Sequence, residues 1–404
     1  MSDTVYILGA GVNQEIFARG KVSPPLTDNF FNTAFRINQR FNLYDKSLEP
    51  VYNFIAKYWR KQKQDLRNSS FDLEECFTLL QLQINDMIDE GNEFEYNKLK
   101  EVQSILLSFF IEVLNEFKGY IRQSDQFLKF AELLYRQKPN IITFNYDDFL
   151  ETAIEYASGE NGSHEYLSIH QHDLTTEDLK IVSLKSKWKW NRPLGYEIKF
   201  DKVSLHDGSE GKYVKHLPGT IFYNVNNQYS WKIFKLHGSI NWYRYINDSP
   251  NQHLDDDQVN EIYRARKDKI ILQSPVWFLP LSDLPWDRNQ LFLSPILITP
   301  VLYKHFSSDN IARRIFEPQW NKSKELLSNC KRLVIVGYSF PTTDFYSKKL
   351  LLESTSKNNI EELIIVNPDS KVVEYTKNII SGKKIQIFKN LKCYLKDNKN
   401  GIFD

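Results

Sequence analysis

The sequence predicts an α/β fold, in which a Rossmann-like parallel sheet carries a large helical insertion and a smaller β-containing insertion. Three observations predict it. An apolar strand at residues 4–9 ends in a glycine turn, residues 313–388 alternate strand and helix patterns, and residues 46–138 have helical periodicity. We therefore expect one domain over residues 1–404, with a helical insertion at 46–138 and a mixed, β-rich insertion at 158–232.

The composition narrows the function class. The 404 residues are 41% apolar and 14% aromatic, which is enough for a sizeable core, and the net charge is only +1. We expect no direct nucleic-acid or membrane binding. No secretory signal pattern is present, and Cys76, Cys330 and Cys393 stand far apart. The sequence therefore favours a cytoplasmic protein with neither a zinc site nor a disulfide framework.

The expected elements begin with the strand at 4–9, which leads through a glycine turn into a helix starting near Asn13. The segment 24–41 predicts another helix, with Thr27 or Asp28 as its N-cap. The apolar face of that helix comprises Phe30, Phe31, Ala34 and Phe35.

The helical insertion has apolar residues at three- and four-residue steps, and Gly91 is the only glycine between Gly20 and Gly119. The two clearest apolar stripes are Leu73, Phe77, Leu80, Ile84 and Met87, and Ile105, Phe109, Val113 and Phe117. This pattern predicts long helices placed between the first two core strands.

The remaining elements follow from local periodicity. A buried strand is expected at 140–145 and a helix at 147–157. Short strands are expected in the β-rich insertion at 180–190, 196–204 and 219–224, before a core strand at 232–236. The C-terminal part predicts helices at 313–329, 343–355 and 370–380, and strands at 332–336, 362–366 and 385–388.

The first strand end carries Gly9-Ala-Gly11. Glycine lets a backbone approach a pyrophosphate, and the start of the next helix attracts its charge, although a tight strand–helix turn has the same pattern. The full GxGxxG pattern is absent because Gln14 occupies the third glycine position. An ordinary dehydrogenase is therefore disfavoured.

Other strand ends carry polar residues suited to a nucleotide. Asn145 and Asp147 follow the strand at 140–145, where α/β folds place ligand contacts, although Asp147 or Asp148 also suits as a cap of the next helix. His237 follows the next core strand, and an imidazole there can accept a proton from a ribose hydroxyl or from water, or serve a structural role. The later strand ends add Gly337, Ser339 and Asn367, which suit either a nucleotide or a turn.

Taken in order, these motifs resemble the NAD-binding core of the Sir2 (sirtuin) family, in its bacterial Sir2-like branch. The matching motifs are Gly9-Ala-Gly11-x-Asn13, Asn145-x-Asp147, His237-Gly238 and Gly337-Tyr-Ser339. The resemblance implies a Sir2-type arrangement of the sheet, with Gly9, Ala10, Gly11 and Asn13 around the NAD diphosphate.

The resemblance also implies the remaining roles. Asn145 would hold the ribose and the attacking water, Asp147 would support the site, and His237 would act as the general base. The adenosine half would lie near Gly337, Ser339 and Asn367.

The chain departs from the family at two places. The zinc-binding cysteines of protein-deacylating sirtuins are missing, and the family's Gly-Ile-Pro-Asp-Phe-Arg stretch is replaced by residues 25–30. Asp28 or Asn29 takes the aspartate position there, and no arginine matches. These departures disfavour deacylation but do not affect the residues that the resemblance implies for NAD cleavage.

The resemblance therefore implies an NAD+ glycohydrolase that releases nicotinamide and ADP-ribose, with NAD as substrate and no zinc. It further implies a regulated, NAD-depleting effector of bacterial anti-phage defence. Such a protein is expected to be a homo-oligomer and to work, in some members, with a HerA-type ATPase; the helical insertion could serve as an assembly surface. Two alternatives stay open: a non-catalytic NAD or ADP-ribose sensor that controls a partner, and an NAD-dependent protein deacylase.

Three other clusters favour structural interpretations. His170-Gln-His172-Asp173 looks like a metal triplet without a spaced partner, and Asp255-Asp-Asp257 suits a solvated loop. Lys185-Ser-Lys-Trp-Lys-Trp190 interleaves basic and aromatic residues as single-strand binders do, but a half-buried strand has the same alternation.

Overall fold

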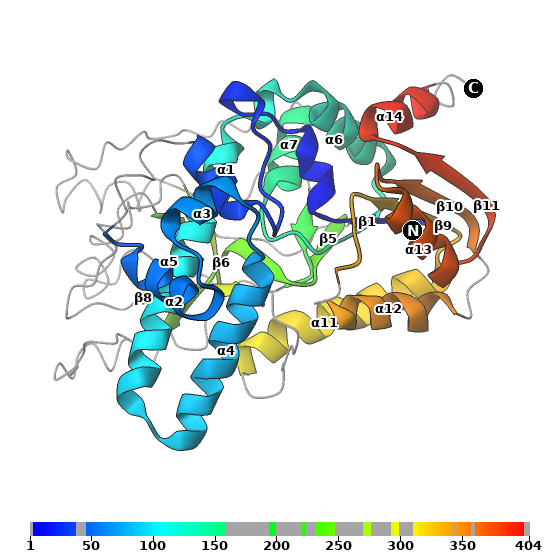
Figure 1. Cartoon of the computed structure of the whole chain (residues 1–404). Helices are drawn as coiled ribbons and strands as arrows, with labels where there is room; N and C mark the ends of the chain where they lie inside the picture. The colour runs from blue at the N-terminus through cyan, green and yellow to red at the C-terminus, as the bar shows by residue number, and fades with distance from the viewer. Residues whose placement is uncertain are drawn as a thin grey trace, which may run out of the picture.

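The computed structural model describes residues 3–37, 46–158, 194–198, 220–222, 231–246, 270–275, 292–298, 310–341, 344–356 and 360–399. Within them a seven-stranded parallel sheet is flanked by helices, and a four-stranded antiparallel sheet lies beside it (Figure 1). The all-parallel central sheet confirms the predicted Rossmann-like α/β fold.

The strand order of the parallel sheet is β11-β10-β9-β1-β2-β5-β3. Its strands are β1 (Thr4–Leu8), β2 (Asn140–Thr143), β3 (Gly195–Tyr196), β5 (Lys232–Lys235), β9 (Arg332–Val336), β10 (Ile360–Val366) and β11 (Gly382–Phe388). The chain builds the half beside β2 first and then returns to the other side of β1. Strand order therefore reverses between β1 and β9, and ligands of such sheets bind at the carboxyl ends of the strands at this point.

Both faces of the central strand are buried, because its side chains alternate between two cores. Val5 and Ile7 belong to the core that also contains Leu327 of α11 and Leu351 of α12. Tyr6 and Leu8 belong to the larger core, with residues of α6 and α7. Figure 1 accordingly shows α6 and α7 on one side of the sheet and α11 and α12 on the other. A continuous apolar strand is what a parallel sheet covered on both faces requires.

The helices are α1 (Phe30–Ile37), α2 (Glu49–Trp59), α3 (Lys63–Asn68), α4 (Leu73–Glu90), α5 (Glu93–Lys118), α6 (Asp125–Gln137), α7 (Phe149–Ala157), α11 (Asn310–Asn329), α12 (Phe345–Thr355), α13 (Ser370–Ile379) and α14 (Leu391–Lys399). The helical periodicity predicted for 46–138 is confirmed, and both stripes are buried except for Met87, which is half-buried. Gly91 ends α4 in the left-handed region, at φ 69°.

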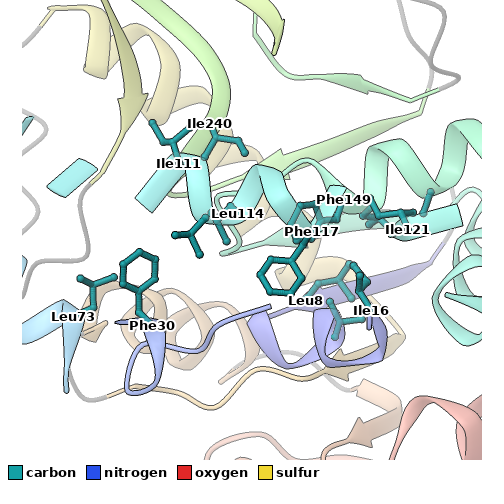
Figure 2. Close-up of a cluster of buried hydrophobic side chains, with 14 of the residues drawn as sticks. Leu8, Ile16, Phe30, Leu73, Ile111, Leu114, Phe117, Ile121, Phe149 and Ile240 are labelled. Atoms are coloured by element: carbon teal, nitrogen blue, oxygen red, sulfur yellow. The ribbon is translucent and has the colours of Figure 1, made fainter. Parts of the chain in front are cut away.

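The helical insertion is part of the main core. Figure 2 shows Leu73 of α4 beside Phe30 of α1, and Phe117 of α5 close to Leu8 and Ile16. These side chains belong to one buried cluster.

Two predictions about elements are wrong. No α-helix starts near Asn13: residues Ala10–Glu15 form a 3₁₀ helix, closed by the bonds Val12 N to Gly9 O and Ile16 N to Asn13 O. The β-rich part also extends beyond residue 232, because the antiparallel sheet has the order β4-β7-β6-β8. Its strands are β4 (Thr220–Phe222), β6 (Gly238–Ile246), β7 (Ile270–Pro275) and β8 (Phe292–Leu297).

Other predicted features fall outside the described residues, namely the strand at 180–190 and most of that at 196–204. Among the helices in the described ranges, none is long and apolar enough to cross a bilayer.

Candidate functional site

A cavity of about 660 Å³ lies at the carboxyl ends of β1, β2 and β9. This volume is in the range of small-molecule and cofactor sites. All eleven residues singled out from the sequence line it: Gly9, Ala10, Gly11, Asn13, Asp28, Asn145, Asp147, His237, Gly337, Ser339 and Asn367. Residues that are far apart in the chain therefore meet where the strand order reverses.

The two glycine turns of the cavity pack against each other. Gly11 N donates a hydrogen bond to Gly337 O at 2.9 Å, and Gly337 has φ +62°. A Cβ on Gly337 would lie 2.3 Å from Val12 N, and a Cβ on Gly9 would lie 2.5 Å from Tyr338 Cα. The close approach of two backbones is therefore enough to require these glycines, and the approach of a pyrophosphate stays a prediction from the sequence.

Asn13 and Asp147 join the ends of β1 and β2. Asn13 is buried in the 3₁₀ helix, and its Nδ2 donates to Asp147 Oδ2 at 2.7 Å. Phe149 N donates to the other carboxylate oxygen at 3.1 Å. Burial raises the pKa of the Asp147 carboxyl to about 6, against the opposing effect of the nearby Lys235 charge and these hydrogen bonds. Asp147 is thus held by its neighbours inside the wall of the cavity.

A buried ion pair lies directly behind this carboxylate. Lys235 Nζ donates to the backbone oxygen of Asp147 and to Glu151 Oε1, the latter at 3.1 Å. The side chains of Lys235 and Glu151 are both fully buried, and Tyr196 OH donates to the same Glu151 oxygen at 2.9 Å. The ends of β2 and β5 are therefore tied together by a polar network beneath the cavity floor.

The sequence suggested Asp147 or Asp148 as a cap of the following helix, but the Asp148 side chain does not cap it. Asp148 occupies the N-cap position of α7 without a side-chain capping bond. Its Oδ2 instead pairs with Lys118 Nζ of α5 at 2.7 Å, and Asp147 receives the backbone N–H of Phe149. The reason is tertiary: the C-terminal end of α5 brings a cation to this buried carboxylate.

Asn145 and Asn367 also bridge strand ends. Asn145 Nδ2 donates to Gly9 O at 3.2 Å, and Asn145 N donates to Thr143 Oγ1 at 3.1 Å. Asn367 Nδ2 donates to Tyr338 O at 3.3 Å and links the ends of β10 and β9 in the same way. Both amides lie on the cavity and brace its backbone.

His237 lies where the parallel strand β5 passes into the antiparallel strand β6. Gly238 follows with φ +85°, and a Cβ there would lie 2.2 Å from Ile296 O of β8. Ile298 N donates to His237 O at 2.9 Å. The histidine backbone is therefore fixed by both sheets at once.

The His237 ring is nearly buried among aromatic side chains and one carboxylate. Its centroid lies 5.3 Å from that of Phe144 and 5.7 Å from that of Tyr146. Its Nε2 lies 3.2 Å from Asp344 Oδ2. An imidazole in this arrangement has its orientation set by neighbours and is suited to proton transfer.

Sequence reasoning missed the contribution of the helical insertion to the cavity. Leu73 and Glu74 of α4 and Phe110 and Leu114 of α5 line it. Burial raises the pKa of Tyr146 well above the usual phenol range, and the charge of Glu74 adds to this effect. No local motif marks these four residues, because they lie on helix faces far from the strand ends in sequence.

Asp344 is another cavity residue that sequence reasoning did not single out. It follows the Gly337-Tyr-Ser339 segment and precedes a helical pattern. That position marks it as a helix cap, and nothing local to it points to His237.

No protein-family model matches this sequence, and no curated protein matches it. In the part of the chain that the structure describes, no group of three or more His, Cys, Asp or Glu side chains is arranged to hold a metal ion. The clusters at 170–173, 185–190 and 255–257 lie outside those residues.

Proposed function

We propose that this protein is an NAD+ glycohydrolase that cleaves NAD+ to nicotinamide and ADP-ribose. One observation carries the proposal. Residues from separate strand ends, in the order of the Sir2 motifs, line one cavity at the point where the strand order of a parallel sheet reverses. Such points bind dinucleotides in many α/β proteins.

The lining suits the two halves of NAD differently. Asn145 and His237 carry the amide and imidazole that a ribose and its attacking water need, whereas Gly337, Ser339 and Asn367 lie on the β9 and β10 side. The bond to nicotinamide would stretch toward an oxocarbenium-like ribose. Nicotinamide leaves as a neutral molecule, so the reaction needs a base and positioned water more than a strong acid.

The cellular role that we propose follows from the resemblance to the bacterial Sir2-like branch. The role is NAD depletion in the cytoplasm during anti-phage defence, carried out by a homo-oligomer. A HerA-type ATPase, which some members of that branch have as partner, is the candidate partner. Because NAD depletion harms the host cell, the activity requires a switch.

The test is NAD+ consumption by the purified wild-type chain, with products separated by chromatography. Asn145→Ala and His237→Ala are compared with Asn329→Ala, whose residue lies on an exposed face of α11 and donates only to Glu325 O. We expect nicotinamide and ADP-ribose from wild type and from Asn329→Ala. We expect turnover at least about 100-fold lower from the two site variants.

Other results would favour the alternatives. Saturable NAD binding without turnover, both by the chain alone and after a HerA-type ATPase is added, would overturn the hydrolase in favour of an NAD or ADP-ribose sensor. Nicotinamide release that depends on an added acylated peptide would favour a deacylase.

A further inference from the structure

A buried carboxylate lies beside the His237 ring and belongs to Asp344, to which the proposed reaction assigns no role. Asp344 is 4% exposed and lies at the N-cap of α12. Its Oδ2 is 3.2 Å from His237 Nε2, which is at the long end of the N–H···O hydrogen-bond range. The two residues come from different halves of the sheet, because His237 follows β5 and Asp344 follows β9.

The two oxygens of Asp344 have separate duties. Ser347 N donates to Oδ1 at 3.4 Å, which caps α12. Tyr338 OH donates to Oδ2 at 3.2 Å, and Ser347 Oγ donates to the same oxygen. Asp344 therefore makes more contacts than a helix cap requires. Its Oδ1 accepts the capping bond of α12, and its Oδ2 accepts two hydroxyl hydrogen bonds beside the imidazole.

Other capping aspartates of the described chain provide the contrast. Asp72 Oδ1 accepts the backbone N–H groups of Glu74 and Glu75, and Asp369 Oδ1 accepts that of Lys371. Both carboxylates accept solvent-exposed hydrogen bonds at the starts of their helices. Helix capping alone therefore does not explain why Asp344 is buried against a histidine ring.

We propose that Asp344 is a positioning residue that holds the His237 ring with its proton on Nε2 and its lone pair on Nδ1. A neutral imidazole carries one N–H, and a carboxylate accepts hydrogen bonds but donates none. The nitrogen facing Asp344 is therefore the protonated one, and Nδ1 is left as the basic atom. The consequence for reaction rate rests on the proposed NAD+ hydrolysis; the consequence for the ring does not.

In that reaction the proton balance is simple. As the bond between ribose C1′ and nicotinamide breaks, its electron pair stays on the nicotinamide nitrogen. A water oxygen bonds to C1′, and the water proton moves to Nδ1 of His237. Asp344 stays ionised and stabilises the imidazolium that forms.

The first experiment measures the ring without any substrate. Imidazole nitrogens of the full chain, labelled at histidine with ¹⁵N, are observed by long-range ¹H–¹⁵N correlation, and the His237 signals are identified by their loss in His237→Ala. We expect a single Nε2–H tautomer in wild type. Asp344→Asn keeps an oxygen to cap α12, but its amide can donate or accept, so a mixture of the two tautomers is expected.

Asp72→Asn is the matched control, because it makes the same change at a helix cap outside the cavity lining. Its spectrum should equal that of wild type. An Nδ1–H tautomer in wild type, or an unchanged His237 spectrum in Asp344→Asn, would overturn the proposal.

The second experiment measures steady-state NAD+ hydrolysis. Asp344→Asn should lower kcat about 10²–10⁴-fold with KM changed less than about threefold, since the ring and not the binding wall is altered. Ser347→Ala removes one brace without touching the ring and should lower kcat by less than Asp344→Asn does.

The two proposals fail in different ways. If wild type hydrolyses NAD+ and Asp344→Asn is equally active, Asp344 does not position the base while the hydrolase stands. If wild type is inactive both alone and with an added HerA-type ATPase, the glycohydrolase fails and the tautomer measurement alone decides the role of Asp344.

Discussion

The cavity has two walls of different origin. The strand-end wall comprises Gly9–Asn13, Asn145–Asp147 and Gly337–Ser339, and it is formed by turns and polar side chains directly after parallel strands. The insertion wall comprises Leu73, Glu74, Phe110 and Leu114, from two helices, and is mostly apolar. The comparison shows that only part of a site can be predicted from a sequence. Turns after strands have local sequence signals, whereas a helix face that closes a cavity is defined by packing.

The two walls are joined by direct contacts. The Phe110 ring meets the Tyr146 ring edge-on, with centroids 5.6 Å apart, and Lys118 of α5 pairs with Asp148 behind the strand-end wall. The buried cluster of Figure 2 also includes residues beside both walls, with Leu73 and Leu114 from the insertion and Leu8 from the end of β1. Three predictions test how strongly the insertion wall and the strand-end wall contribute to the stability of the protein.

Deleting residues 46–138 should have the largest effect and should prevent folding. Phe30, Leu8 and Phe149 would lose buried partners on α4, α5 and α6. Emptying a core site costs about 3–5 kcal/mol for one large side chain, and a whole domain is stable by only about 5–15 kcal/mol. Circular dichroism and urea titration of the shortened chain measure this. A folded protein with cooperative unfolding would show that the insertion is a separate unit.

Lys118→Met should be the next most damaging change. The variant keeps the length of the side chain but removes the cation beside Asp148, whose side chain is 1% exposed. Removing one partner of a buried ion pair costs about 3–5 kcal/mol, because a buried charge loses its counter-ion. Urea unfolding near neutral pH measures this.

Lys129→Met is the matched control for that variant, since Lys129 pairs with Asp125 on the exposed face of α6. An exposed pair is worth less than about 1 kcal/mol. Equal losses in the two variants would show that Lys118 does not link the walls.

Asp147→Asn should have a smaller effect that depends on pH. Burial raises the pKa of this carboxyl from 3.8 to about 6, so the folded state holds the proton more tightly than the unfolded state does. The contribution of Asp147 to the free energy of unfolding is therefore largest below pH 4, and it is lost as the pH rises through about 6.

Between pH 4 and 7.5 the free energy of unfolding of wild type should fall by about 2–3 kcal/mol relative to that of Asp147→Asn. Chemical unfolding of both proteins at the two pH values measures the difference. A constant difference would mean that Asp147 titrates alike in the folded and unfolded states.

Much of the fold could be predicted, because its signals are local. Residues 5–8 and 333–336 are continuous apolar runs, which predict strands covered on both faces. The strands at 140–143 and 360–366 lie within a residue or two of their predicted bounds. The carboxyl ends of parallel strands meet at one edge of the sheet. That single geometric fact explains why the predicted site residues that follow strands line the same cavity, whereas Asp28 reaches it from the loop before α1.

Errors arose where a distant segment decided the local structure. The turn after β1 is a 3₁₀ helix because Gly11 bonds to Gly337 and Asn13 bonds to Asp147. Asp148 pairs with a lysine of α5, and strand β6 forms because β7 and β8 pair with it. None of these partners is close in sequence.

The sequence by itself determined the alternation of strands and helices, the helical insertion and the polar residues at each strand end. Periodicity, glycine turns and capping residues act within a few positions, so they can be read directly from a chain. Only the tertiary structure decided which side chains close the cavity from the insertion and which carboxylate faces His237. Those choices depend on packing between segments brought together by the reversal of strand order, and that packing is encoded in no short stretch of residues.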